Sequence, residues 1–410
     1  MNILYFAIES NLSSSGVTQK IKDQACALGS FSDSTTLLLV NARHGLHRFR
    51  YSKKNNDLEL IETVPPLPAG NDGISSLYQI YKYYSTNLPY FLDKICEEES
   101  ITSLYCRKLP MYPNLISALQ TAKNKHSFDV CCEIPTYPYL YEFLKEFRII
   151  HLLLEFLFSR SMYRIIDHFF LITDKINEKR VPFKRWTRIT NGISVDRIPT
   201  RSSYPSLANG LNLLGLANAS FWHGYDRVIR GIHDYNKSSV AGTPVSFHVV
   251  GLGPATPSLK ELARDLGVEE QVIFHGPRFG AELDDIFSRC QIGVGSLGAH
   301  RKRLFETSEL KTREYCARGL PFFIGSKDPD FPAELDFIHY VTSDDSPVDI
   351  ESILDFARSL EPDKSVAEGM REYARMNLDW KKIMAKVYQT FELLAEKKAA
   401  TKKKPERSEA

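Results

Sequence analysis

Short apolar segments of strand length alternate with longer segments of helical periodicity, and this pattern starts twice along the chain. The first series begins with Ile3–Ile8, and the second begins with Leu211–Leu216 after a stretch that contains Pro199 and Pro205. Buried strands that alternate with helices predict a parallel sheet with helices on both faces. The other expected strands are 36–40, 104–107, 129–133, 169–173 and 188–190 in the first series, and 245–250, 272–275, 292–296, 322–324 and 339–341 in the second.

The fold class predicted from this pattern is α/β, with two tandem Rossmann-like doubly wound domains. The length of 410 residues agrees, because single hydrophobic cores rarely grow beyond ~300 residues. We expect a first domain over residues 1–195 and a second over 196–375. Residues 376–396, which carry an amphipathic stripe, are expected to form a helix that crosses back to the first domain. Residues 397–410 are rich in Lys, Ala and Glu and are expected to form a disordered basic tail.

Charge and cysteine content narrow the class of protein. Lys plus Arg number 52 and Asp plus Glu number 50, whereas a dedicated nucleic-acid binder needs a strong basic excess, so no nucleic-acid partner is expected. Seven cysteines without a C-x-x-C pair fit reduced thiols in a cytoplasmic protein. No zinc-ligand spacing occurs, and neither a metal site nor a cofactor is expected.

The segment from Gly293 to Gly325 is the most informative about chemistry. Seven residues separate Glu306 from Glu314, and a helix is expected over Ser308–Arg318 with Ser308 as its N-cap. Backbone amides at a helix N-terminus attract phosphate. The layout therefore suits a ligand that lies across a helix N-terminus, with carboxylates on sugar hydroxyls and amides on a diphosphate.

Cations near this helix strengthen the interpretation. Lys311 falls in its first turn, and Arg301 and Arg303 fall in the preceding loop. The letters Gly319-Leu320-Pro321 then end the helix and open a strand, as expected between a helix and a strand of a parallel sheet. Such a helix begins at the carboxyl edge of the preceding strand, where α/β proteins bind ligands.

The pair Glu306-x7-Glu314, followed by Ala317-Arg318-Gly319-Leu320-Pro321-Phe322, resembles the nucleotide-sugar signature of GT-B glycosyltransferases, in particular of the large retaining family that carries E-x7-E. Further segments resemble this family in the family's order, over residues 1 to about 395: Ser13-Ser14-Ser15-Gly16, Thr190-Asn191-Gly192-Ile193, Trp222-His223-Gly224-Tyr225-Asp226-Arg227, His248-Val249-Val250-Gly251-Leu252-Gly253 and Val272-Ile273-Phe274-His275-Gly276.

The resemblance implies a role for each matching position. Glu306 would contact hydroxyls of the donor sugar, and Glu314 would contact the ribose. Leu310 and Lys311 would bind the diphosphate through a backbone amide and an ammonium. The other positions implied in donor binding are Gly16, His223, Gly224, Arg227 and Gly253.

Two letters depart from the family pattern. The Arg that usually follows the first strand of the second domain is missing from Gly215-Leu216-Ala217-Asn218, and the usual Lys before Gly224 is His223. Both residues normally hold the diphosphate. We therefore expect Arg227, Arg301 or Lys311 to supply the missing positive charge, and Glu306, Lys311 and Arg301 to be the catalytic residues.

Glu133 and Tyr137 follow a first-domain strand in a Pro-rich segment. One hypothesis is that they contact the acceptor or the donor sugar. The alternative is a loop held by prolines and aromatic packing.

Basic and aromatic residues also crowd Phe143–Arg164. This segment fits either a membrane-facing amphipathic helix, suited to a lipid-linked acceptor, or a helix packed on the first-domain sheet with solvated charges.

The resemblance implies transfer of a sugar from a nucleoside diphosphate sugar to a hydroxyl of a glycan or lipid-linked glycan, with retention and without metal. The implied setting is polysaccharide biosynthesis in the cytoplasm, and a membrane-facing helix would place the enzyme at the inner face of the membrane. The alternatives are a nucleotide-sugar epimerase on the same scaffold and a degenerate, non-catalytic partner subunit.

Overall fold

The chain folds into two compact units in the computed structural model. The first comprises Met1–Ile189 and Trp380–Ala410, and the second comprises Thr190–Asp379. The structure describes residues 1–8, 16–41, 45–65, 87–139, 149–173, 178–238, 242–360 and 364–402. The serines 13–15 of the expected glycine loop, residues 143–148 of the basic and aromatic segment, and residues 403–410 of the expected tail lie outside the described residues.

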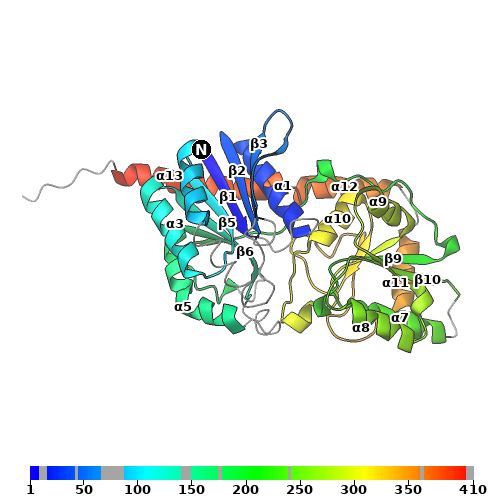
Figure 1. The fold of residues 1–410 in the computed structure, drawn as a ribbon. Helices are drawn as coiled ribbons and strands as arrows, with labels where there is room; N and C mark the ends of the chain where they lie inside the picture. The colour runs from blue at the N-terminus through cyan, green and yellow to red at the C-terminus, as the bar shows by residue number, and fades with distance from the viewer. Residues whose placement is uncertain are drawn as a thin grey trace, which may run out of the picture. The chain divides into compact units, whose positions relative to one another are not determined.

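The described residues of the first unit include an eight-stranded sheet (Figure 1). Its strands are β1 (Asn2–Ile8), β2 (Ser34–Asn41), β3 (Gly45–Ser52), β4 (Asp57–Val64), β5 (Ser103–Arg107), β6 (Asp129–Tyr137), β7 (His168–Thr173) and β8 (Trp186–Arg188). Their order across the sheet is β4-β3-β2-β1-β5-β6-β7-β8. Pairing is parallel from β2 to β8, as predicted.

The antiparallel hairpin of β3 and β4 was not expected from the sequence. The predicted strands were recognised as continuous apolar runs, which is the pattern of parallel strands buried on both faces. β4 lies at the sheet edge, and most of its residues are partly or fully exposed. Its apolar and charged residues are therefore mixed, and they give no such run.

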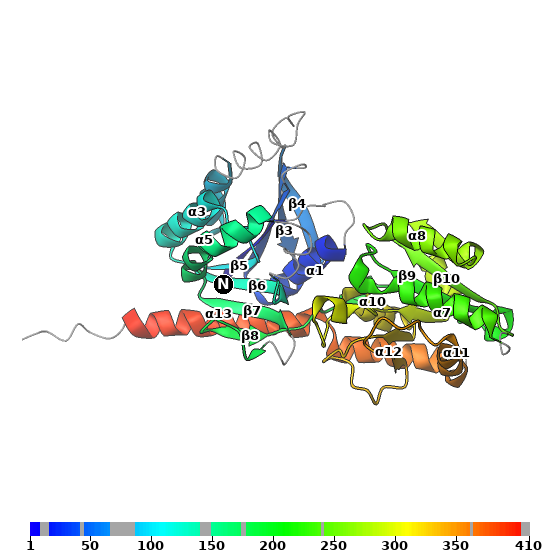
Figure 2. The same cartoon turned by 90° about the horizontal axis from the view of Figure 1, so that it is seen from below.

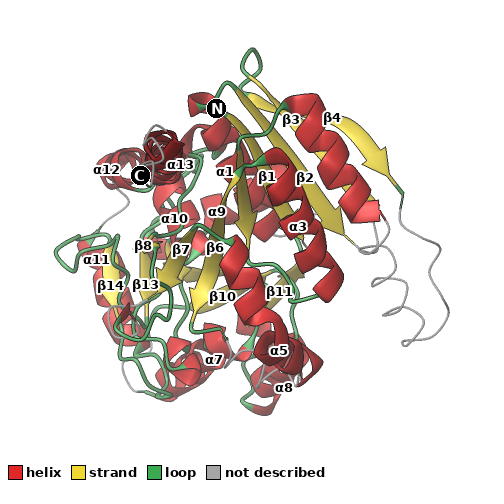
Figure 3. Ribbon diagram, turned by 90° about the vertical axis from the view of Figure 1, so that its left-hand side faces the viewer, coloured by secondary structure: helices red, strands yellow, loops and turns green. Residues whose placement is uncertain are grey.

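Helices cover both faces of this sheet. They are α1 (Gly16–Phe31), α3 (Pro113–His126), α5 (Ile149–Ile165) and α13 (Trp380–Lys402). Leu4 and Phe6 of β1 belong to one core cluster with α3 and α5, which lie side by side in Figure 3. Tyr5, between them, points to the other face and bonds Gln24 of α1. Successive strand residues point to opposite faces, so one strand serves both layers.

The C-terminal helix belongs to the first unit, where α13 packs against α1 and β6 (Figure 2). This agrees with the expected crossover helix. The helix continues to Lys402, past the expected end at Glu396. The Lys and Ala residues that read as a disordered tail are also good helix formers, so the helix continues through them.

Glu133 is fully buried in the first unit, where it joins β5, β6 and α1. Its carboxylate accepts hydrogen bonds from Lys20 Nζ at 2.6 Å, Gln24 Nε2 at 2.7 Å and the Tyr105 hydroxyl at 2.9 Å. These contacts favour a structural role for Glu133 over the hypothesis that it contacts a sugar. The residue is part of the core, and its charge is matched by a buried lysine.

We predict that Glu133→Gln lowers the free energy of unfolding by about 3–5 kcal/mol, because the buried Lys20 ammonium loses its counter-charge. Urea unfolding would measure the change. Glu392→Gln, at an exposed position of α13, is the control and should change stability by less than about 0.5 kcal/mol. Equal stability of the two variants would contradict the structural role of Glu133.

The second unit holds a six-stranded, all-parallel sheet among its described residues. Its strands are β9 (Leu211–Leu216), β10 (Val245–Val250), β11 (Val272–Gly276), β12 (Ile292–Val294), β13 (Phe322–Ile324) and β14 (Ile338–Tyr340). Their order is β11-β10-β9-β12-β13-β14, so the chain reverses its direction of winding between β9 and β12. This is the doubly wound order predicted from the sequence.

Helices cover both faces of the second sheet as well. They are α7 (Tyr225–Lys237), α8 (Thr256–Asp265), α9 (Gly280–Arg289), α10 (Leu310–Arg318), α11 (Ile350–Ser359) and α12 (Lys364–Asn377). Leu213 shares a core cluster with α7, α8 and α11. Leu214, the next residue, shares another with α9, α10 and α12. Within the described ranges, no helix combines the length and apolar content needed to cross a membrane.

A buried guanidinium fixes the start of α10. Arg313 is fully buried, pairs with both oxygens of Asp328, and also pairs with Asp330. Its Nε donates to the Asn191 carbonyl at 3.1 Å. The expected cap Ser308 instead accepts a bond from the Asn191 amide at 2.7 Å, and Glu309 is the N-cap residue. The helix therefore begins at Leu310, later than predicted.

Asp328→Asn is expected to destabilise the second unit by about 3 kcal/mol, because it leaves the Arg313 charge buried and only partly matched. Asp330→Asn is the matched control. The Asp330 side chain is 20% exposed, so water can replace part of the lost interaction, and a loss near 1 kcal/mol is expected. Thermal unfolding of both variants would test this order. A larger loss for Asp330→Asn would overturn it.

Candidate functional site

The carboxyl edge of the second sheet has its switch point between β9 and β12, where doubly wound proteins bind ligands. The loops that follow these two strands are bonded to each other. The Leu297 amide donates to the His223 carbonyl at 2.9 Å, and the Gly298 amide donates to the Trp222 carbonyl at 3.2 Å. These bonds hold the short helices η3 (Phe221–His223) and η5 (Ala299–Lys302) against each other.

Two of the predicted glycines allow close approach between these loops. Gly224 has φ +66°, and a Cβ at this position would lie 2.8 Å from the Gly298 nitrogen. A Cβ at Gly253 would lie 2.3 Å from the Ala219 carbonyl oxygen. The turn after β10 and the loop after β12 therefore both press on the loop after β9, and larger residues would push them apart.

Lys311 lies on the first turn of α10. Its Nζ is 3.4 Å from the Tyr225 hydroxyl and 3.9 Å from Oε2 of Glu309. The side chain is 9% exposed, and burial lowers the pKa of its ammonium to about 8. Lys311 thus brings a desolvated positive charge to the N-terminus of α10, where backbone amides also attract anions.

His223, at the position where the family pattern has Lys, is neutral near pH 7. Burial lowers its pKa well below the usual value, and Lys311 and Lys302 lower it further. Its Nδ1 accepts a bond from the Ser220 amide at 2.9 Å. The proton of the neutral ring therefore sits on Nε2, and the residue offers a hydrogen-bond donor without a charge.

The guanidinium of Arg227, expected to supply a charge to the ligand, bonds carbonyl groups of the protein. Arg227 is fully buried, and it donates to the carbonyls of Leu297 at 2.7 Å, Ser346 at 2.7 Å and Thr342 at 3.0 Å. These bonds occupy its donors and hold the loop after β12 against the segment after β14.

Arg301 is also tied to the protein rather than turned to a ligand. Its NH1 and NH2 each donate to Asp226 at 2.8 Å, and its Nε donates to Asp345 at 2.7 Å. NH1 also donates to the Phe221 carbonyl at 2.6 Å. Two carboxylates pair with this guanidinium, which links η5 to α7 in this structure.

The two glutamates of the motif lie on different elements. Glu306 is half-buried in the loop before α10. Its backbone pairs with the backbone of Lys327 as an isolated parallel β-bridge. Glu314 lies on α10, and its carboxylate accepts a bond from Arg318 Nε at 2.9 Å. Leu310 is the first residue of α10, so its amide belongs to the helix N-terminus as expected.

Sequence reasoning did not single out Glu309 and Lys302. The Glu309 carboxylate accepts a bond from the Ser296 amide at 2.9 Å and lies beside Lys311, which links the loop after β12 to the start of α10. Lys302 Nζ lies 4.5 Å from the centre of the Trp222 ring. Lys302 stands between the two arginines that the sequence did single out, and this run of basic residues was the available signal.

Two predicted residues lie in the first unit. Gly16 is the exposed first residue of α1. The Tyr137 hydroxyl donates to the Arg180 carbonyl at 3.0 Å, and its ring packs edge-on against Tyr139 and Phe183. These contacts favour the alternative of aromatic packing at Tyr137.

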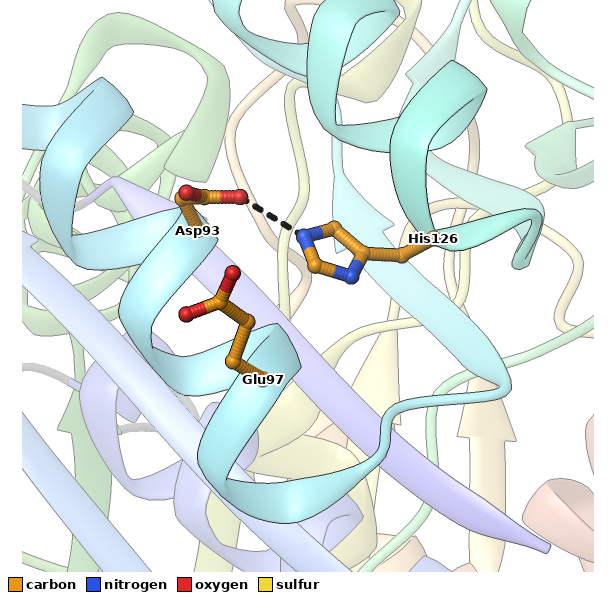
Figure 4. Close-up of side chains that lie close together, drawn as sticks. All are labelled: Asp93, Glu97 and His126. Atoms are coloured by element: carbon orange, nitrogen blue, oxygen red, sulfur yellow. Dashed lines mark hydrogen bonds and ion pairs between the residues drawn. The ribbon is translucent and has the colours of Figure 1, made fainter.

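Asp93, Glu97 and His126 also lie together in the first unit, as Figure 4 shows. His126 Nε2 is 2.7 Å from Asp93 Oδ1. Lys125 Nζ bonds both carboxylates, at 2.8 Å to Asp93 and 2.7 Å to Glu97. This ammonium offsets part of the negative charge of the two carboxylates, and the group is an ion-pair network between a helix of residues 87–99 and the end of α3.

No protein-family model and no curated protein matches the sequence. Solved structures match over nearly the whole chain. Sucrose-phosphate synthase from Thermosynechococcus elongatus is 12% identical with a TM-score of 0.68, and the match covers 96% of this chain and 99% of that one. HepE from Anabaena, solved with UDP and glucose, is 14% identical with a TM-score of 0.62, covering 96% and 99%.

A third match is the trehalose-6-phosphate synthase OtsA, at 11% identity and a TM-score of 0.61, with 95% of this chain and 98% of that chain covered. Each of these matches spans nearly the full length of both chains. The chain therefore has the GT-B fold that its motifs predicted.

Proposed function

We propose that the protein is a glycosyltransferase that moves a sugar from a nucleoside diphosphate sugar to a hydroxyl of a glycan or lipid-linked glycan, with retention and without a metal ion. The observation that carries the proposal is Lys311 at the N-terminus of α10, between Glu306 and Glu314 in sequence and at the switch point of the second sheet. HepE, which has the same fold, was solved with UDP-glucose.

A diphosphate needs positive charge and hydrogen-bond donors at one place. Lys311 supplies the charge, the first amides of α10 supply donors, and His223 offers Nε2–H beside them. Arg227 bonds backbone carbonyls and Arg301 pairs with aspartates, so both arginines support the loops. We therefore assign to Lys311 the ion pair with the diphosphate.

The barrier in such a transfer is departure of the diphosphate from the anomeric carbon through an oxocarbenium-like centre. Negative charge grows on the leaving phosphate oxygen, and fixed donors aimed at that oxygen stabilise it. In a retaining, front-face transfer, the leaving phosphate itself accepts the proton of the acceptor hydroxyl. Glu306 would hold the sugar hydroxyls, and Glu314 would hold the ribose.

Nucleotide affinity is expected to depend on pH. Lys311 binds the diphosphate only as an ammonium, and its pKa in the free protein is about 8. Affinity should therefore be full below pH 8 and fall as the pH rises through it, by about tenfold at pH 9. Isothermal calorimetry would measure this with whichever of UDP, GDP and ADP raises the melting temperature most.

Two variants serve as controls for this pH effect. Lys311→Arg keeps its charge at every pH tested, so its affinity should be nearly constant from pH 7 to pH 9. Lys311→Met should bind about 10–100-fold more weakly at pH 7 and show no further loss at pH 9. The same pH profile in wild type and Lys311→Met would remove Lys311 from the diphosphate site.

The two glutamates of the motif are expected to act on different parts of the donor. Glu306→Gln should lower kcat/KM for transfer about 10–100-fold and leave nucleoside diphosphate affinity within about twofold, because only the sugar contact is weakened. Glu314→Gln should weaken nucleoside diphosphate binding itself by about tenfold, because a charged bond to the ribose is lost. Glu282→Gln, 71% exposed on α9, is the matched control.

Incubation with the sugar nucleotide and a glycan acceptor, followed by mass spectrometry, tests the activity. A glycosylated acceptor is expected. A new sugar nucleotide formed without acceptor would indicate an epimerase instead, and nucleotide binding with neither product would indicate a non-catalytic subunit.

A further inference from the structure

Helix α5 exposes more large apolar surface than a packed helix normally does. Five of its side chains are more than half exposed: Ile149 at 70%, Ile150 at 63%, Leu153 at 56%, Phe156 at 83% and Leu157 at 54%. Single exposed apolar residues are ordinary on protein surfaces. Five on one helix form a contiguous patch, and such patches mark interaction sites.

The exposed positions lie on one face of the helix. At 3.6 residues per turn, the exposed residues of α5 fall within an arc of about 140°. The opposite face is fixed in the first unit, because Met162 and Ile165 are buried in its core. The helix is thus held in place by one side, and its apolar side faces outward.

The charged residues of α5 are also divided between its two faces, with the arginines on the exposed face and the carboxylate on the buried one. Arg160 and Arg164 are exposed, and they continue the outward face beyond the apolar patch. The only carboxylate of α5, that of Glu155, lies on the inward face and is buried. It accepts bonds from Lys108 Nζ at 2.9 Å and the Tyr163 hydroxyl at 2.7 Å. The outward face therefore combines apolar side chains with positive charge and carries no negative charge.

A partner surface that binds the outward face of α5 must have an apolar layer that the side chains can enter, next to fixed negative charges. A protein groove could take the apolar side chains, but the two arginines at one end would then need matching carboxylates. An anionic phospholipid surface supplies both needs at once, since acyl chains begin a few ångströms below phosphate groups. Guanidinium groups bind phosphate strongly and in a bidentate geometry.

We propose that α5 is a membrane-docking helix that lies in the plane of an anionic phospholipid surface, with its five apolar side chains in the acyl boundary and Arg160 and Arg164 on phosphate headgroups. The proposal rests on the exposed face of α5 alone and does not depend on glycosyl transfer.

Co-sedimentation of the full chain with vesicles tests it. We expect the protein to sediment with vesicles of phosphatidylcholine mixed with phosphatidylglycerol, and to bind phosphatidylcholine alone far more weakly. The triple variant Leu153→Ser, Phe156→Ser and Leu157→Ser should lower the partition coefficient about 100-fold. The double variant Arg160→Gln and Arg164→Gln should lower it about 30-fold and remove most of the salt dependence.

The matched control replaces exposed apolar residues elsewhere, Leu252→Ser and Phe279→Ser in the second unit, which are 61% and 53% exposed. It should bind vesicles as the wild type does. All substituted side chains are solvent-exposed, and circular dichroism would confirm that each variant folds. A wild-type protein that stays in the supernatant with anionic vesicles would overturn the proposal. So would a triple variant that binds like wild type, or a patch shown by light scattering to join two copies of the chain.

Discussion

The buried guanidinium of Arg227 holds together the loops at the carboxyl edge of the second sheet. It comes from the first turn of α7, and it bonds carbonyls in the loop after β12 and in the segment that follows β14. A fully buried cation is costly unless all its donors are used. Because the bonds can form only when these segments meet, the loops that frame the candidate site have little freedom to rearrange.

Positive charge around this edge is divided between support and binding. Arg227, Arg301 and Arg313 are each matched by carbonyls or carboxylates of the second unit. The Lys311 ammonium lies 3.9 Å from the Glu309 carboxylate and 3.4 Å from the Tyr225 hydroxyl, both long contacts, and burial lowers its pKa. A group that is desolvated and only weakly paired gains most from an incoming anion, so the same buried arrangement that weakens its charge in the free protein favours a phosphate ligand.

Much of the fold was predictable because parallel strands buried on both faces leave continuous apolar runs, such as Leu211–Leu216 and Val245–Val250. The hairpin of β3 and β4 was not predictable, because the solvent-exposed edge strand β4 contains polar residues among its apolar ones and gives no continuous apolar run. The start of α10 was predictable only to within two residues, since the choice between Ser308 and Glu309 as cap depends on Asn191, which is distant in sequence.

The candidate site residues also fall into those that local sequence features indicate and those whose environment depends on tertiary contacts. Motif spacing predicted roles for the glutamates, Lys311 and the close-packed glycines, which are local features of the chain. It could not show that Arg301 faces Asp226 and Asp345, or that Glu133 faces Lys20, because those pairs are made by tertiary folding. A charged residue near a motif in sequence is a candidate ligand, and only its partners in space decide whether it is available.

The first unit is assembled from two segments that the whole of the second unit separates in sequence, and this has a consequence for biosynthesis. Trp380, almost completely buried in that unit, lies beneath Lys20 of α1, with Lys20 Nζ 5.6 Å from its ring. During translation all residues of the second unit are made before α13. Residues 1–189 are made earlier still, but the first unit lacks α13 until the second unit has been synthesised. The nascent chain therefore completes the second unit first, and the surface of α1 that packs against α13 stays uncovered until residues 380–402 have been synthesised.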